Sequence, residues 1–206
     1  MLKLLGRADS INVQKVMWCL EELGLEYERT DIGGKFGGNQ EADYIAKNPT
    51  GLIPTLVDGN FTLWESHSIV RYLVDAYGKS PWLTDDPKAR GVANQWMDWT
   101  LFTLWRPMVL SYIGLYRTPP EDRDNETINK ALEQWSKHNQ LLDNVLANSD
   151  YIAGNEISMG DLAVGPFVYR WLNMDIEHPK VSNLEKYYAR LTERPAFKKH
   201  VMLPLT

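Results

Sequence analysis

The sequence has a single cysteine, Cys19, so the chain cannot form an internal disulfide, and a reducing compartment is its natural location. No stretch approaches the roughly 18 consecutive apolar residues that a membrane-spanning helix requires, and residues 1–7 contain no apolar run typical of a signal peptide. An excess of basic residues is also missing, since the formal net charge is −5. These absences predict a cytoplasmic protein that binds neither nucleic acid nor membranes.

The composition is that of a soluble globular protein, with 44% hydrophobic and 24% charged residues, and 206 residues suffice for two modest domains. Up to residue 78, short strand patterns alternate with helical ones. Strands are predicted at 1–5, 27–32, 54–57 and 61–64, and helices at 13–23, at 42–47 and from Ser66, which is expected to cap its helix. This order predicts a small mixed sheet with helices.

Residues 79–87 contain two prolines and two aspartates and are typical of a linker. Beyond them the strand signals end, and helical patterns cover 88–116, 125–147, 158–172 and 184–193. Six of the eight tryptophans lie after residue 81, which favours an all-helical bundle packed around bulky aromatic side chains. We therefore predict an α/β domain over 1–78 and an all-α domain over 88–206.

Three short segments of the first domain are candidates for a binding site. Pro54 opens a strand directly after a turn and is a candidate cis-proline, which would expose the backbone of Ile53 to an extended peptide ligand. The alternative is an ordinary trans turn proline. Glu65 and Ser66 begin a helix, where unpaired N–H groups favour an anion and Glu65 could hold an ammonium group. The alternative is a simple serine cap with a surface glutamate.

The third segment is the loop that holds Ser10 and Asn12 between the first strand and the first helix. Ligands of small α/β folds gather at the C-terminal ends of strands, which favours a role in binding or catalysis. Both residues are also common helix caps, so capping is the alternative.

Taken together and in this order, these segments resemble the glutathione transferase family, and its bacterial theta/phi-like serine type in particular. The resemblance rests on the Ser10-x-Asn12-x-x-Lys15-Val16 element, on Asn48-Pro49 leading into Ile53-Pro54, on Glu65-Ser66, and on residues 190–197. It covers nearly the whole chain. It implies a thioredoxin-like N-terminal domain that binds glutathione, a helical C-terminal domain that completes an electrophile pocket, and a homodimer active in detoxification.

The resemblance also implies roles for particular residues. Ser10, with Asn12 as the second candidate, would activate the glutathione sulfur for attack on a small hydrophobic electrophile. Ile53 beside Pro54 would pair with the cysteinyl unit, and Glu65 and Ser66 would hold the γ-glutamyl end. The family often has a lysine where this chain has Leu52, so the glycyl carboxylate needs another partner. Candidates for that partner are Lys35 and Asn39, and those for the electrophile pocket are Trp105, Met108, Tyr112 and Trp171.

Other residues are interpreted as structural. Cys19 falls within the first helix, past the loop where a catalytic cysteine of this family belongs, so we expect a half-buried inert thiol. Ser158 and Asp161 have the spacing of a capping box. The Lys198-Lys199-His200 cluster is interpreted as a solvated face. The four histidines show no metal-ligand spacing, so no metal is expected.

Two alternative functions stay open at this stage. The same site could serve a glutathione-dependent disulfide reductase or peroxidase. A non-catalytic binding or assembly protein with this fold is the second alternative, but it would need none of Ser10, Ile53-Pro54 and Glu65-Ser66, so their presence favours an enzyme.

Overall fold

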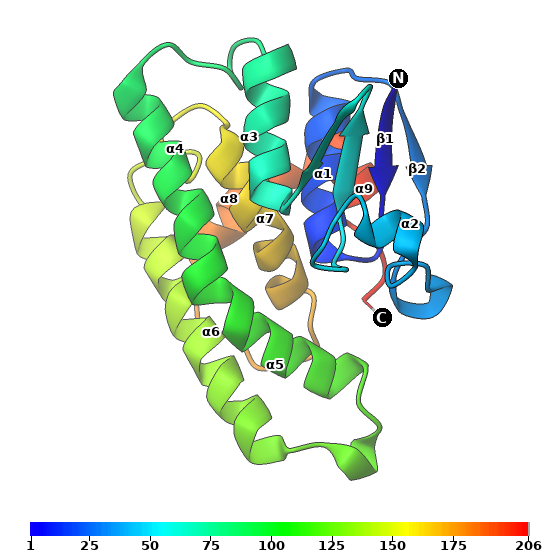
Figure 1. Ribbon diagram of the computed structural model, residues 1–206. Coiled ribbons are helices and arrows are strands. Elements are labelled where there is room, and N and C mark those ends of the chain that lie inside the picture. Colours follow the sequence, from blue (N-terminus) through cyan, green and yellow to red (C-terminus); the bar gives the residue numbers. More distant parts are fainter. Residues whose placement is uncertain (206) are drawn as a thin grey trace. The chain divides into compact units, whose positions relative to one another are not determined.

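The structure is a computed structural model that describes residues 1–205. It divides into two compact units, the first comprising Met1–Leu83 together with Pro195–Leu203, and the second built from Thr84–Arg194. The first unit extends to residue 83 instead of 78 and takes up a segment near the C-terminus that the sequence analysis had assigned to the helical domain. Each unit is described by itself below (Figure 1).

The first unit has a four-stranded mixed sheet in the order β2-β1-β3-β4. Strand β1 pairs in parallel with β2 and antiparallel with β3, which pairs antiparallel with β4. Its elements are β1 (Leu2–Leu5), α1 (Ile11–Glu22), β2 (Tyr27–Thr30), η1 (Gly34–Phe36), α2 (Ala42–Ile45), β3 (Thr55–Asp58), β4 (Phe61–Trp64) and α3 (Ser66–Tyr77). The predicted mixed sheet and thioredoxin-like order are confirmed.

Helices α1 and α3 pack against each other beside the sheet (Figure 1). Helix α1 forms because its apolar residues recur at helical spacing, and Val13, Val16 and Leu20 are all fully buried. It ends where Gly24 takes a φ of +66°, a conformation that glycine adopts without strain. The N-terminal ends of α1 and α3 thus both belong to the unit that contains the sheet.

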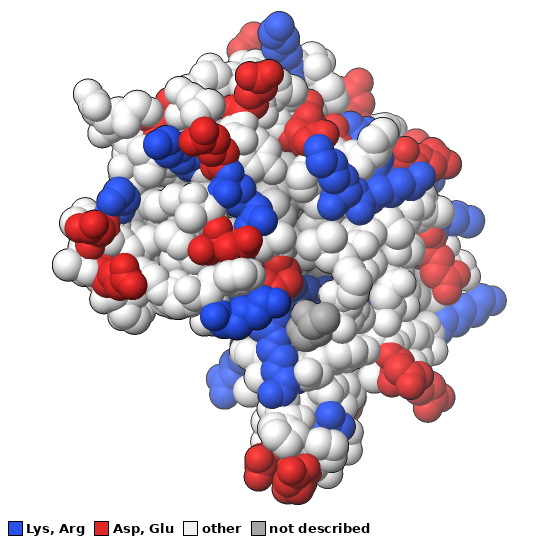
Figure 2. Space-filling model, turned by 90° about the vertical axis from the view of Figure 1, so that its right-hand side faces the viewer, with Lys and Arg blue, Asp and Glu red and all other residues white. Residues whose placement is uncertain are grey.

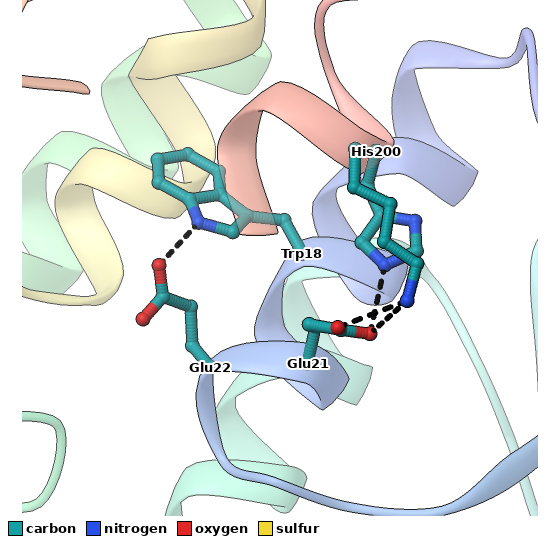
Figure 3. Close-up of polar contacts among 5 residues, drawn as sticks. Trp18, Glu21, Glu22 and His200 are labelled. Atoms are coloured by element: carbon teal, nitrogen blue, oxygen red, sulfur yellow. Dashed lines mark hydrogen bonds and ion pairs between the residues drawn. The ribbon is translucent and has the colours of Figure 1, made fainter. Parts of the chain in front are cut away.

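A short helix near the C-terminus, α9 (Pro195–His200), completes the first unit by docking on α1. Phe197 is fully buried, and its ring meets the Trp18 ring edge to face at a centroid distance of 4.8 Å. Figure 3 shows the polar part of this contact, where Lys199 Nζ donates to Glu21 at 2.8 Å and His200 Nε2 lies 3.2 Å from the same carboxylate. The interpretation of this cluster as a solvated face is therefore wrong for His200, which is buried.

The second unit is all-helical, as predicted. It contains α4 (Pro87–Trp99), the π-helical segment η2 (Thr100–Leu104), α5 (Trp105–Tyr116), η3 (Pro120–Asp122), α6 (Asn125–Val145), α7 (Met159–Leu172) and α8 (Ser182–Thr192). Trp135, Trp171 and Phe167 are fully buried in this bundle.

Two properties of the described chain bear on the classes of function considered above. Among residues 1–205, no helix combines the length and apolar character needed to cross a bilayer. Figure 2 shows one face of the molecule, on which Lys and Arg side chains lie among Asp and Glu side chains.

Candidate functional site

Ser10 ends the loop after β1 and is the N-cap residue of α1. Its side chain makes no capping hydrogen bond, and within residues 1–205 the hydroxyl has no hydrogen-bond partner. The first intrahelical bond runs from Gln14 N to Ser10 O at 2.9 Å, so the N–H groups of the first turn before it point out of the helix end. A half-buried hydroxyl and these N–H groups thus lie together, available to an anion.

Ile53 precedes Pro54 through a cis peptide bond, as predicted. Its side chain lies close to Gly6, in the loop after β1. A Cβ placed on Gly6 would be only 3.4 Å from Ile53 Cβ. The backbone groups of Ile53 have no hydrogen-bond partner within residues 1–205, whereas the following residues enter β3. This leaves one N–H and one C=O at the end of the strand that an extended ligand can pair with.

A buried polar network that the sequence analysis did not identify holds the loop in front of Ile53. Asn48 Nδ2 donates to Leu52 O at 2.8 Å and to Thr55 Oγ1 at 3.0 Å, and the Tyr44 hydroxyl contacts the same two residues. Asn48, Thr55 and Tyr44 are all buried. Because every described donor in this network has a partner, the network fixes the path of the chain that leads into Ile53.

Glu65 lies between β4 and α3 with a φ of +69°, and it is the only non-glycine residue of residues 1–205 with a positive φ. Such a conformation costs on the order of 1–3 kcal/mol and is typical of functional sites. Glu65, not Ser66, is the N-cap of α3, which corrects the expectation that Ser66 caps this helix. The first intrahelical bond, from Ile69 N to Glu65 O, leaves the preceding N–H groups of α3 outside the helix ladder.

Ser66 is buried and its hydroxyl donates to Asn12 Oδ1 at 3.3 Å, so it reaches across to α1. Asn12 Oδ1 also accepts from Lys15 Nζ at 3.1 Å, and Lys15 Nζ lies 3.0 Å from His67 Nε2. Lys15 is fully buried and His67 nearly so. In the sequence, Lys15 had no role beyond its place in the Ser10-x-Asn12-x-x-Lys15-Val16 motif. Its burial depends on contacts with residues more than 50 positions away, which no local pattern indicates.

The two candidates for the glycyl carboxylate differ in availability. Asn39 Nδ2 donates to Gly51 O at 2.7 Å, so the amide already supports the turn before Ile53. Lys35 is exposed on η1, with Nζ 5.2 Å from the centre of the Phe36 ring. Arg7 adds a cation that the sequence analysis missed, since a Cβ on Gly34 would lie 2.7 Å from Arg7 Nε. The positive side chains near η1 are therefore Lys35 and Arg7.

Of the four electrophile-pocket candidates, three are buried in the helical unit. Trp171 is fully buried, with its ring 4.5 Å from that of His178, and it packs as a core residue. Met108 and Tyr112 are 2% exposed and contact the Arg170 guanidinium, which lies 4.4 Å from the Tyr112 ring centre. Trp105 is 37% exposed, so it is the candidate with an accessible face.

Cys19 lies in the third turn of α1 and is 1% exposed, so it is fully buried instead of half-buried. Burial raises the pKa of its thiol far above the ordinary value, and the nearby Glu22 carboxylate raises it further. A thiol held protonated in this way is a poor nucleophile.

We expect Cys19→Ala to leave turnover nearly unchanged and to lower the free energy of unfolding by roughly 1–2 kcal/mol through lost packing. Steady-state kinetics and chemical denaturation of the variant measure the two quantities. A loss of activity beyond about a hundredfold in a folded variant would show that the cysteine takes part in the chemistry.

Two family models match the chain, and both match parts of one family. The model described as "Glutathione S-transferase, N-terminal domain" covers residues 1–75, and "Glutathione S-transferase, C-terminal domain" covers 97–195. The Glutathione S-transferase GstB of Escherichia coli is 42% identical over 208 residues, with both chains fully covered. Glutathione S-transferase D6 of Drosophila melanogaster is 30% identical and covers 91% of this chain and 85% of its own.

Solved structures agree with these sequence matches. A theta class glutathione S-transferase from Xanthomonas axonopodis pv. citri, with glutathione bound, has a TM-score of 0.96 and 41% identity, covering 100% of this chain and 99% of its own. The apo form of that protein has a TM-score of 0.88. The two matched domains, the full-length relative and the arrangement of Ser10, Ile53 and Glu65 lead to one conclusion: the chain belongs to the glutathione S-transferase family.

Proposed function

We propose that the first unit binds glutathione and that Ser10 activates its thiol as a thiolate for attack on a small hydrophobic electrophile. The observation that carries the proposal is the left-handed backbone of Glu65 at the start of α3. A glutamate is held there at a cost in stability, next to helix N–H groups that favour an anion. A carboxylate beside an anion site suits an amino-acid head group, such as the γ-glutamyl end of glutathione.

Other residues of the first unit supply the remaining proposed contacts to glutathione. Ile53 offers its unpaired N–H and C=O to the main chain of the cysteinyl unit. The cysteine sulfur then faces the loop after β1, where the uncommitted Ser10 hydroxyl can donate to it. Lys35 is the accessible cation for the glycyl carboxylate, with Asn39 supporting the adjacent turn. Binding of the electrophile by the helical unit, assembly as a homodimer and a cytoplasmic location stay predictions from the family resemblance.

We expect Glu65→Ala to weaken glutathione binding by roughly 1–3 kcal/mol, because the ammonium group loses a charged partner. Isothermal titration calorimetry measures the change. Glu28→Ala removes the same charge from an exposed position on β2 and should leave the affinity unchanged.

A second variant separates the side chain of Glu65 from its backbone. Glycine adopts a positive φ freely, so Glu65→Gly should be at least as stable as Glu65→Ala and should show the same loss of affinity. If either variant binds glutathione as tightly as the wild type, the Glu65 carboxylate does not contact the ligand and the proposed binding mode is wrong.

A further inference from the structure

We propose that Lys15 is a positioning residue, which fixes the Asn12 side chain so that its amide N–H group donates to the α-carboxylate of the γ-glutamyl residue of glutathione. The inference rests on the proposed function, and it gives Asn12 a role in binding instead of thiol activation. It is carried by the buried cluster of Lys15, Asn12, Ser66 and His67, which joins α1 to α3 within the first unit.

The orientation of the Asn12 amide follows from the chemistry of its neighbour. A lysine ammonium has three donors and no acceptor, so the amide atom 3.1 Å from Lys15 Nζ must be the oxygen. The reverse orientation would place the amide N–H group against the ammonium, with two sets of donors facing each other. Lys15 therefore decides which end of the amide points inward. The Ser66 hydroxyl, which can donate or accept, donates to the oxygen in this orientation at 3.3 Å.

The position of the amide nitrogen follows in turn. Oδ1 of Asn12 faces Lys15 and Ser66, which are 0% and 3% exposed, whereas Asn12 itself is only partly buried. Nδ2 diverges from Oδ1 at the planar amide carbon, so neither Lys15 nor Ser66 engages it, and it has no hydrogen-bond partner within residues 1–205. A neutral donor is thus presented beside Ser66, at the start of α3.

The location selects the ligand group. Asn12 contacts the first residue of α3, which is also where Glu65 is expected to hold the γ-glutamyl ammonium. The carboxylate of the same amino-acid head group is bonded to the carbon that bears the ammonium. A donor at this position therefore suits that carboxylate better than the sulfur, which is expected near Ser10 at the helix cap.

The test is a double-mutant cycle of Lys15→Met and Asn12→Ala with two ligands. One ligand is glutathione, and the other is 4-aminobutyryl-cysteinyl-glycine, which lacks only the α-carboxylate. For glutathione we expect each single variant to lose about tenfold in affinity and the double variant to lose no more than either, because Lys15 acts through Asn12. For the analogue we expect all four proteins to bind within about twofold of one another.

Lys3→Met is the matched control, since Lys3 is an exposed lysine on β1, and it should not change the affinity for either ligand. Additive losses in the double variant, equal losses for both ligands, or a Lys15→Met variant that binds glutathione like the wild type would each overturn the inference. Should wild-type protein fail to bind glutathione at all, the proposed function itself fails, which is a separate result.

A measurement on the wild-type protein keeps the inference testable even where Lys15→Met does not fold. The side-chain amide resonances of Asn12, assigned by their loss in Asn12→Ala, should shift when glutathione is added and shift much less with the analogue. Resonances that respond equally to both ligands, or to neither, would show that the Asn12 amide does not donate to the carboxylate.

Discussion

Replacing Ser10 with alanine is expected to lower kcat/KM at pH 7 by roughly 10- to 100-fold, while glutathione affinity changes much less. A hydrogen bond to a charged group contributes about 1.5–3 kcal/mol, which corresponds to a rate change of this size. The loss should shrink as the pH is raised, since glutathione then ionises without help. Steady-state kinetics between pH 6 and 9, together with a thiolate absorbance titration of the glutathione complex, measure both effects.

The reason lies in the ionisation of the thiol. A free thiol has a pKa of about 8.5, so only a few per cent is thiolate at neutral pH, and the thiolate is the nucleophile. Burial of the sulfur raises its pKa, whereas hydrogen bonds to the sulfur and the N–H groups at the start of α1 lower it. The Ser10 hydroxyl is available for this bond because it does not cap its own helix.

Two variants make the assignment sharp. Ser10→Thr keeps a hydroxyl at the same position and should retain most of the activity that Ser10→Ala loses. Asn12→Ala should leave the pKa of the bound thiol close to the wild-type value, because the Asn12 amide is expected to contact the γ-glutamyl end. If only Asn12→Ala raises the thiol pKa, the Ser10 hydroxyl does not stabilise the thiolate and thiol activation belongs to Asn12.

The elements of the fold were largely predictable because they depend on local patterns. The apolar spacing of α1 and α3 and the alternation of strands and turns are visible in single segments. Helices α4 to α8 follow from long stretches in which apolar residues recur at helical spacing. Helix α9 was missed because it has six residues and its apolar content is small. Its position is fixed by Phe197 against Trp18 and by Glu21 against Lys199 and His200, contacts between residues about 180 positions apart.

The site shows the same division. Ser10, Ile53, Pro54 and Glu65 could be proposed as candidates because they lie beside turns and helix starts that the sequence marks. The Lys15–His67 and Ser66–Asn12 contacts join residues more than 50 positions apart, and no local pattern indicates them. A lysine on an amphipathic helix ordinarily reaches solvent, so its full burial in this chain could be recognised only from the packing of α1 against α3.

The largest expected loss of stability comes from Asp161→Ala, in the capping box of α7. The predicted pair with Ser158 is confirmed, since Ser158 N and Oγ both donate to Asp161 Oδ2, at 2.8 and 3.1 Å. The structure adds a contact that the spacing does not predict, in which Ile152 N donates to Oδ1 at 3.0 Å. Because Asp161 and Ile152 are buried, alanine leaves the Ile152 N–H group unpaired away from water, and the partly buried Ser158 N–H group loses its partner as well.

We expect Asp161→Ala to lower the free energy of unfolding at pH 7 by about 2–4 kcal/mol, since each unpaired buried donor costs roughly 1–3 kcal/mol. Chemical denaturation measures the loss. Asp124→Ala is the matched control, because Asp124 also caps a helix of this unit, through Thr127 N, but it is exposed and should cost much less. Glutathione affinity of the folded Asp161→Ala protein should not change, because Asp161 lies outside the unit proposed to bind it.

The loss of unfolding free energy in Asp161→Ala should also depend on pH, and the burial of Asp161 determines in which direction. Burial raises the pKa of this carboxyl to about 6, although its hydrogen bonds oppose the shift, whereas its ordinary value is 3.8. The folded state therefore binds a proton more readily than the unfolded state, and the stability contributed by that proton is present below about pH 4 and is lost as the pH rises through 6. Asp161→Ala has no such group, so its deficit relative to the wild type should be larger at pH 5 than at pH 7. Denaturation curves at the two pH values decide the matter, and a deficit that stays constant or grows toward pH 7 would mean that the folded carboxyl ionises at its ordinary pKa or below it.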